Sequence, residues 1–356
     1  MSIYRDIILL VSTIAVAGVV ATPAAAARVA DLYSATVEIN DRARSPLNNA
    51  FDRALGEVLV KVTGLPEAGA AEARVGALAN AAQLVQQYSR LPENQLQVSF
   101  NARAVRQALD EAGLPVWSEN RPLVVIWYAL DPGDGNRLIL SEATEAESGD
   151  ENQQITAVLE QLTGTAEQRG LPVALPLVDA EDMGVVSFAD LWGDFPGPVM
   201  LASQRYGADA VLVGRARNTK PDNDRVRWTL TMDNEQFAWE GTVSSGPEQA
   251  AAMMAQRFAT TADSAGTLRV LVRNVDSLEK YGQLKNYFAR LSIVENSAVT
   301  RVDGSELEFE LVVRGDAQRL DSTLSRSLLL QPASIESDLM EIGRLPDLVY
   351  TWAQDI

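Results

Sequence analysis

The chain has 356 residues, which is enough for two or three domains that each bury a core. Hydrophobic residues make up 47% and charged residues 22%, as in ordinary globular proteins, so a wholly disordered chain is excluded. Lys and Arg number 30 against 48 Asp and Glu, for a formal charge of -18. Because nucleic acids bind cationic surfaces, this balance argues against a nucleic-acid partner.

Two residue types that carry much of enzyme chemistry are missing. The chain has no histidine, which excludes Ser-His-Asp and Cys-His catalysis and the commonest zinc ligand. It has no cysteine, which excludes disulfides and a lipidated cysteine. No phosphate-cradling glycine motif follows a strand, and Asp131–Asn136 lacks the ligand spacing of a calcium loop. We therefore predict no catalytic, cofactor-binding or metal-binding residues.

The N-terminus has the pattern of a cleavable secretory signal, residues 1–27. The apolar run Ile7–Val20 has the length of a signal core, and small residues before Arg28 offer cleavage sites. An uncleaved anchor is the alternative, but the run is shorter than the roughly 20 residues of a spanning helix. We expect a mature protein that begins near Arg28, lies in the periplasm of a Gram-negative bacterium and has no transmembrane span.

Residues 28–118 are predicted to form an α+β module. Tyr33–Ile39 alternates apolar and polar residues like a half-buried strand. A helix starts at Pro46 and ends before Gly64, and a second, alanine-rich helix is expected at Ala71–Gln87. A further strand at Leu96–Phe100 leads into a helix capped by Asn101.

Residues 121–262 are predicted to form an α/β sandwich with an antiparallel edge. Leu123–Leu130 is apolar without alternation, which is typical of a strand covered on both faces. Leu201–Asn218 combines a short amphipathic helix, a stop at Gly207 and a second apolar strand. The other expected elements are a helix closed by Gly170, a strand at Pro172–Val178, an irregular aromatic segment at Phe188–Pro198, a hairpin about Asp233–Glu235 and a covering helix at Gln249–Thr261.

Residues 266–331 show a βαββα pattern, which favours a ferredoxin-like C-terminal domain. Ser277 caps its first helix, and Asp303 and Gly304 mark a tight hairpin turn. Residues 332–356 are interpreted as a partly ordered tail that either covers a neighbouring surface or binds a partner.

Four segments carry a family resemblance: Ala54–Gly64, Arg121–Leu130, Arg205–Arg215 and Tyr281–Leu284. Through them the mature chain resembles a proteobacterial exported family, domain of unknown function 2066. The central part of the third segment is also similar to envelope α/β domains of the curli-secretion, TolB amino-terminal and flagellar T-ring type. This resemblance implies a TolB-N-like fold for the central domain, and the closer family has no assigned activity to carry over.

We therefore expect an exported, non-enzymatic protein that serves envelope assembly, or acts as an accessory factor, by contacting another envelope protein. One alternative is a carboxylate-dependent glycan hydrolase, since 48 acidic residues allow a catalytic pair. Another is a small-ligand binding module at the carboxyl edge of the central sheet, where the loops after Leu130 and Val178 would meet. Trp127 and Tyr128 are expected in the core, whereas Trp192 and Phe195 either cover it or form a contact site. The sequence leaves the partner and the oligomeric state open.

Overall fold

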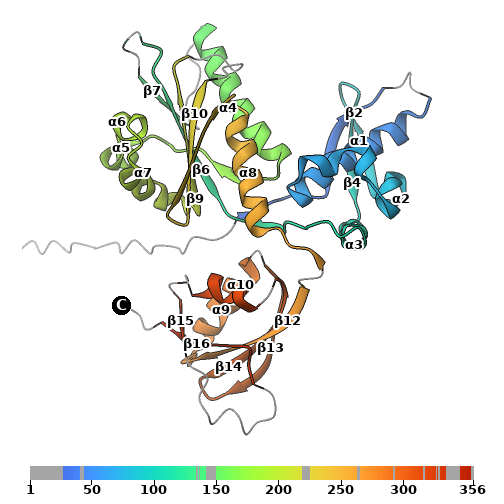
Figure 1. Cartoon of the computed structure of the whole chain (residues 1–356), viewed down its shortest axis with the longest axis vertical. Coiled ribbons are helices and arrows are strands. Elements are labelled where there is room, and N and C mark those ends of the chain that lie inside the picture. The colour runs from blue at the N-terminus through green and yellow to red at the C-terminus, as the bar shows by residue number, and fades with distance from the viewer. Residues whose placement is uncertain are drawn as a thin grey trace, which may run out of the picture.

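The computed structural model describes residues 27–40, 44–133, 135, 137–141, 150–218, 225–262, 265–291, 293–315, 317–325, 327, 329–333 and 345–353. These residues form three units, each with its own hydrophobic core, and the fold is mixed α and β as predicted (Figure 1). The predicted signal segment lies, apart from Ala27, outside the described residues. None of the helices in the described ranges combines the length and the apolar character that crossing a membrane requires.

In the N-terminal unit, a three-stranded antiparallel sheet in the order β2-β4-β3 packs against helix α1. Pro46 opens α1, and Gly64 ends it with a left-handed φ of 73°. Asn101 caps α3, because its side chain accepts a hydrogen bond from the N–H of Ala104. The elements are β1 (Ala27–Arg28), β2 (Ser34–Glu38), α1 (Pro46–Thr63), η1 (Pro66–Gly69), η2 (Ala71–Ala73), η3 (Gly76–Ala79), α2 (Ala81–Leu84), β3 (Val85–Leu91), β4 (Gln95–Phe100), α3 (Ala102–Glu111) and β5 (Asn120–Arg121).

The prediction of an alanine-rich helix at Ala71–Gln87 is wrong. The segment consists of 3-10 turns, the single helical turn α2 and the start of strand β3. Gly76 takes a left-handed φ of 58°, which interrupts any continuous helix. The segment has too few large apolar residues for a helical stripe, and its end gains hydrogen bonds by pairing with β4 instead.

The central unit is a mixed sheet in the order β11-β10-β9-β6-β7, with β8 beside the amino end of β6. Helices α4 and α8 cover one face, and α5, α6 and α7 cover the other (Figure 1). Strands β6, β8 and β9 are parallel, and every residue of β6 and β9 is buried. The elements are β6 (Val124–Leu130), β7 (Leu138–Leu140), α4 (Asp150–Gln168), β8 (Val173–Ala174), α5 (Ala180–Val185), α6 (Phe188–Trp192), α7 (Pro196–Ser203), η4 (Gln204–Tyr206), β9 (Ala210–Ala216), β10 (Val226–Met232), β11 (Glu235–Gly241) and α8 (Ser245–Phe258).

The hairpin predicted about Asp233 is confirmed. Asp233 and Asn234 have φ angles of 52° and 65°, which is the geometry of a two-residue turn matched to the twist of its strands.

Two other predictions in this unit are wrong. The strand expected at Pro172–Val178 has only two residues, because the chain leaves the sheet after pairing with Val124 and Val125. The aromatic segment Phe188–Pro198 is mostly helical rather than irregular, since Ser187 and Asp190 form a capping box that starts α6.

In the C-terminal unit, β14 lies between the parallel strands β12 and β13, which α9 connects. This arrangement contains the split βαβ unit that the predicted ferredoxin-like pattern requires. The elements are β12 (Ala265–Arg273), α9 (Leu278–Arg290), β13 (Val294–Asp303), β14 (Glu306–Arg314), α10 (Ala317–Leu324), β15 (Leu330–Pro332) and β16 (Leu348–Trp352).

The interpretation of residues 332–356 as a tail outside this domain is wrong for residues 345–353. Strand β16 lies within the sheet, between β12 and β15, and Tyr350 is completely buried. The hydroxyl of Tyr350 donates to the carboxylate of Asp321 at 2.6 Å. Because β16 is parallel to β12, it runs antiparallel to β14, whereas the last strand of a ferredoxin-like fold would be parallel to β14. The ferredoxin-like match therefore ends before β16.

Specific side-chain contacts join the three units. Arg121, the last residue of β5, is completely buried and donates to the carbonyl oxygens of Lys61 in α1 and Gly170 after α4, each at 2.7 Å, so it connects the N-terminal and central units. Both terminal nitrogens of Arg314 bind the carboxylate of Asp110, at 3.0 and 3.1 Å, and so connect the C-terminal and N-terminal units. These contacts hold neighbouring units in defined positions.

Candidate functional site

The carboxyl ends of the parallel strands β6 and β9 lie together at one edge of the central sheet. Leu130 at the end of β6 is paired with Ala216 at the end of β9. Strand β10 starts at the same edge, where Arg227 is the direct partner of Arg215. Asp131 follows β6 and Arg137 precedes β7, so several charged side chains gather here.

Three arginines at this edge contact two aromatic rings of α6. The guanidinium carbons of Arg217 and Arg227 lie 5.7 and 5.3 Å from the ring centre of Trp192. Phe188 stacks on Trp192 with 5.4 Å between ring centres, and Arg137 lies 5.5 Å from Phe188. These distances are within the range of cation-π attraction. We call these five residues the arginine-aromatic cluster.

Arg215, the strand partner of Arg227, is only 5% exposed. Its Nη1 lies 3.0 Å from a carboxylate oxygen of Asp194, and its Nη2 donates to the hydroxyl of Thr229. The Nε of Arg215 is buried without a hydrogen-bond partner. Asp194 takes a left-handed φ of 61° in the loop before α7, a conformation that is uncommon for residues other than glycine.

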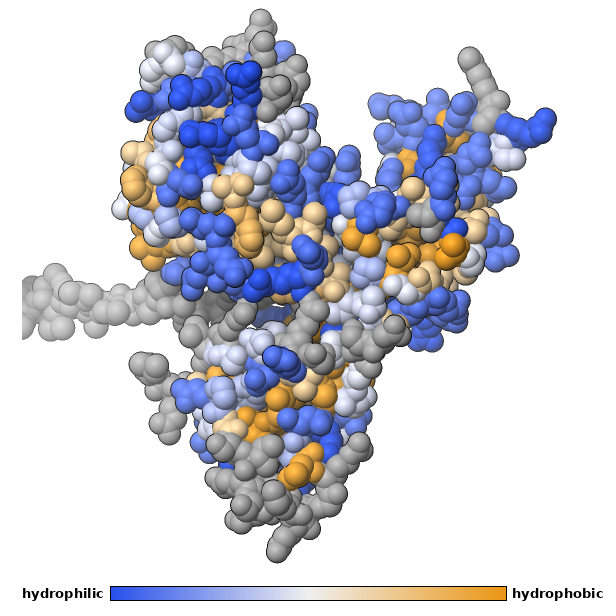
Figure 2. All heavy atoms as spheres, in the orientation of Figure 1, coloured by the Kyte–Doolittle hydropathy of each residue, from blue (hydrophilic) through white to orange (hydrophobic). Residues whose placement is uncertain are grey.

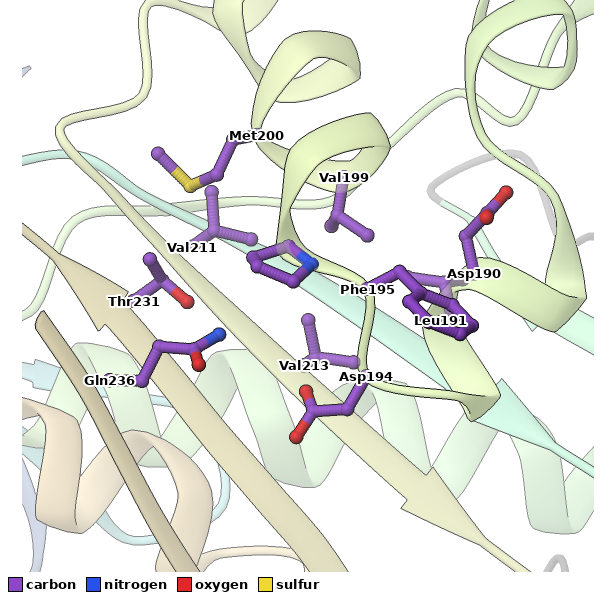
Figure 3. Close-up of a pocket in the computed structure, with 11 residues that line it drawn as sticks. Asp190, Leu191, Asp194, Phe195, Val199, Met200, Val211, Val213, Thr231 and Gln236 are labelled. Carbon is purple, nitrogen blue, oxygen red and sulfur yellow. The ribbon is translucent and has the colours of Figure 1, made fainter. Parts of the chain in front are cut away.

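A shallow hollow continues from Asp194 along the sheet. Figure 3 shows Val199 and Met200 of α7 on one side of it and Thr231 and Gln236 of β10 and β11 on the other. Its free volume is about 10 Å³, roughly the space of one water molecule. Asp190 also lines it, and hydrogen bonds from the hydroxyl and N–H of Ser187 hold the pKa of Asp190 below its usual range. Because its free volume is only about that of one water molecule, the hollow is too small for an organic ligand.

The layer formed by α5, α6 and α7, with the loop before it, exposes several large apolar side chains. We call residues 177–203 the α5–α7 layer. Phe195 is 58% exposed and Leu201 is 56% exposed. On the side drawn in Figure 2, apolar residues form small groups separated by hydrophilic ones on each unit. The large apolar side chains exposed in the layer are Leu177, Met183, Val185, Phe195 and Leu201.

Ion pairs and hydrogen bonds join the start of α5 to η4, the turn that follows the layer. Arg205 donates to Asp179 at 2.7 Å and to Asp182 at 3.1 Å, and the hydroxyl of Tyr206 donates to Asp182 at 2.6 Å. The hydrogen bond from Arg205 lowers the pKa of Asp179 to about 2, and burial raises the pKa of Tyr206 to about 12. Gly207 follows with a φ of 67°. The motif Arg205–Arg215 is thus chiefly a structural joint between layer and sheet.

The structure shows which of the aromatic side chains discussed from the sequence are buried and which are exposed. Trp127 and Tyr128 lie in the core as predicted. Trp192 is half-buried, whereas Phe195 is exposed. The loops after Leu130 and Val178 do not meet at the carboxyl edge, because the chain enters α5 directly after Val178 and the N–H of Leu177 donates to the hydroxyl of Tyr206, before the start of β9. Sequence reasoning did not single out Arg217 and Arg227, whose only signal was their cationic side chains in an acidic chain.

A larger hollow, about 440 Å³, lies in the N-terminal unit. It is lined by residues 29–34 together with Gln86, Ser99, Phe100 and Glu119. Burial raises the pKa of Tyr33 on its wall. Among the described residues, no group of three or more Asp or Glu side chains is placed to hold a metal ion.

Comparison with known proteins gives one partial match. Residues 26–118 match the model of a family described as a domain of unknown function (DUF8605). The match covers the N-terminal unit and less than half of the chain. No curated protein and no solved structure matches the chain. These comparisons assign no activity.

Proposed function

We propose that this is an exported, periplasmic accessory protein that acts without catalysis, by docking another envelope protein on its α5–α7 layer. The observation that carries the proposal is that five large apolar side chains of this one layer are exposed. Methionine and phenylalanine are enriched in protein interfaces, and grouped exposed apolar residues mark contact surfaces. The signal-like N-terminus and the resemblance to envelope proteins support the location.

The charges beside these apolar residues indicate the chemistry of the partner. Glu181 is 69% exposed, Asp179 is 43% exposed and Asp194 is 44% exposed, and Arg205 alone faces three carboxylates, so the layer carries acidic side chains that arginines neutralise only in part. The chain as a whole has a formal charge of -18. A partner with an apolar patch and a basic rim would be drawn to this surface and held in register by it.

The glycan-hydrolase alternative gains no support from the small hollow, although Asp190 and Asp194 both line it. The carboxylate of Asp190 is bound by Ser187, and that of Asp194 is bound by Arg215. Each acid therefore has a structural partner. A hydrolase site also needs room for a sugar ring between its two carboxylates, which this hollow lacks.

A small-ligand binding module is a second candidate, favoured by the order of the strands. Strands β8 and β9 lie on opposite sides of β6, so the next two parallel strands of the chain are added first on one side of β6 and then on the other. Ligands of α/β proteins bind at the carboxyl edge of such a switch point.

The docking proposal is tested by crosslinking in intact periplasm, followed by purification and identification of the captured proteins. A double variant, Met183→Asp with Leu201→Asp, places charges on the layer and should lose the specific partner. Val302→Asp is the matched control, because Val302 is 67% exposed on β13 of another unit. If every envelope protein captured by the wild type is captured equally by the double variant, the layer is not the docking surface.

The location is tested separately by fractionation and by N-terminal sequencing of the purified protein. We expect a periplasmic protein that begins near Arg28. An intact Met1 or a cytoplasmic protein would contradict the proposal.

A further inference from the structure

The arginine-aromatic cluster lies at the topological switch point of the central sheet. Strand β7 and helix α4 connect β6 to β8, with α4 on one face, and the α5–α7 layer connects β8 to β9 across the other face. The carboxyl ends of β6 and β9 therefore lie at the edge where sheets of this kind accept ligands. Arg217 directly follows β9, and Arg227 lies on the neighbouring strand at the same end.

The arrangement of these cations does not stabilise the folded state. Arg215 and Arg227 are direct partners on adjacent antiparallel strands, and like charges in that position destabilise a sheet. Asp194 neutralises Arg215. Within the described part of the chain, no carboxylate forms an ion pair with Arg217 or Arg227, although Glu240 is the strand partner of Arg227.

The aromatic contacts leave the binding atoms of both arginines available. Both side chains are exposed, and a cation-π contact leaves the N–H groups of an arginine free to donate hydrogen bonds. Both guanidinium carbons lie within 5.7 Å of the centre of the same indole ring, so the two cations gather at one side chain.

We propose that Arg217 and Arg227 bind a phosphate group of a ligand at the carboxyl edge of β6 and β9. Phosphate is favoured over carboxylate because a phosphate monoester carries up to two negative charges, which match two guanidinium groups bidentately. A single carboxylate carries only one negative charge and would leave the two arginines with a net positive charge. The phosphate belongs either to a soluble phosphorylated compound or to a lipid headgroup. The inference rests on the ligand-binding candidate and not on protein docking, so each can fail separately.

The test is calorimetric titration of the full chain with inorganic pyrophosphate and, in parallel, with citrate. We expect pyrophosphate to bind, and the double variant Arg217→Gln with Arg227→Gln to weaken it at least about tenfold. The matched control is Arg103→Gln with Arg301→Gln, two exposed or half-exposed arginines elsewhere, which should leave binding unchanged. The proposal is overturned if pyrophosphate does not bind at millimolar concentration, if the double variant binds equally well, or if citrate binds as tightly.

Two further measurements separate the sources and guard against unfolding. Vesicles of phosphatidylcholine with phosphatidic acid should bind the wild type, and not the double variant, if the ligand is a lipid headgroup. Binding of pyrophosphate without vesicle binding assigns a soluble ligand. Without ligand, the double variant should melt at the same temperature as the wild type or higher, because a cationic repulsion is removed. A large fall in melting temperature would instead assign Arg217 and Arg227 a structural role and overturn the proposal.

Discussion

Replacing Arg121 with methionine should unfold the junction between the N-terminal and central units. Arg121 is completely buried, and its guanidinium carbon lies 3.9 Å from the ring centre of Trp117. Its nitrogen atoms donate to carbonyl oxygens of both units and of the connecting segment. The acceptors are Ser118 at 2.8 Å, Gly170 at 2.7 Å, Arg169 at 3.4 Å, Lys61 at 2.7 Å and Trp117 at 3.0 Å.

The magnitude follows from what remains after the guanidinium group is removed. Lys61 lies in the last turn of α1, and Arg169 and Gly170 directly follow α4. Each helix end carries about half a negative charge, so the two together balance about one cation. Methionine would leave these buried carbonyl groups without a donor, and a hydrogen bond to a charged group contributes about 1.5–3 kcal/mol. Because these contributions are not additive, we expect a loss of about 3–5 kcal/mol.

The assay is urea unfolding of the full chain, followed by circular dichroism and by limited proteolysis of the segment between the units. Arg121→Met should lower the midpoint of the first transition and expose residues 112–120 to protease. Arg103→Met is the matched control, since Arg103 is exposed on α3 and should change stability by less than about 0.5 kcal/mol. The reasoning is refuted if Arg121→Met costs less than about 1 kcal/mol or no more than the control.

Three other predictions concern backbone, charge and the last strand. Gly64→Ala should cost about 1–3 kcal/mol more than Gly113→Ala in urea unfolding, because both have a left-handed φ but only the first would place its methyl group 2.1 Å from a methyl of α8. Equal losses would show that α8 moves aside freely. Asp179 contributes stability above its unfolded pKa of about 4, and this contribution is lost as the pH falls to about 2, where the folded group is protonated. Asp179→Asn should therefore flatten the fall in stability over that interval, and an unchanged pH profile would mean that Arg205 does not stabilise the charged form. Deleting residues 345–356 removes β16, so NMR spectra should lose the dispersed signals of the C-terminal unit, and their retention would contradict the burial of this strand.

Local signals in the sequence predicted the elements that local chemistry decides. Pro46 and Gly64 delimit α1, Asn101 caps α3, and Ser277 caps α9 with a hydrogen bond to the N–H of Lys280. Asp233 marks a hairpin turn. In each case the preference belongs to one or two residues and acts without the rest of the fold.

Predictions failed where distant partners decide the conformation. Residues 85–91 form a strand because β4 offers hydrogen bonds, and β16 is ordered because β12 and β15 lie on either side of it. The pattern within either segment does not reveal its partner strand. Strand Val173–Ala174 is short because the chain turns away to cover the other face of the sheet.

The candidate site shows the same division. The five residues of the arginine-aromatic cluster come from four places in the chain. Arg137 precedes β7, Phe188 and Trp192 lie in α6, Arg217 follows β9, and Arg227 lies near the start of β10. Their separation in sequence gives no sign that three cations meet two stacked rings. Only the sheet order, with β7, β9 and β10 ending or starting at one edge, brings them together.

By itself, the sequence determined the mixed α and β class, the caps and turns of individual elements, and the exclusion of chemistry that needs histidine or cysteine, because composition and short-range geometry suffice for these. The tertiary structure alone decided that Arg121 joins two helix ends, that residues 348–352 complete a sheet and that arginines gather at the ends of β6 and β9. Each depends on strand pairing or burial between residues far apart in the chain, and the free energy of such contacts is not encoded in any single segment.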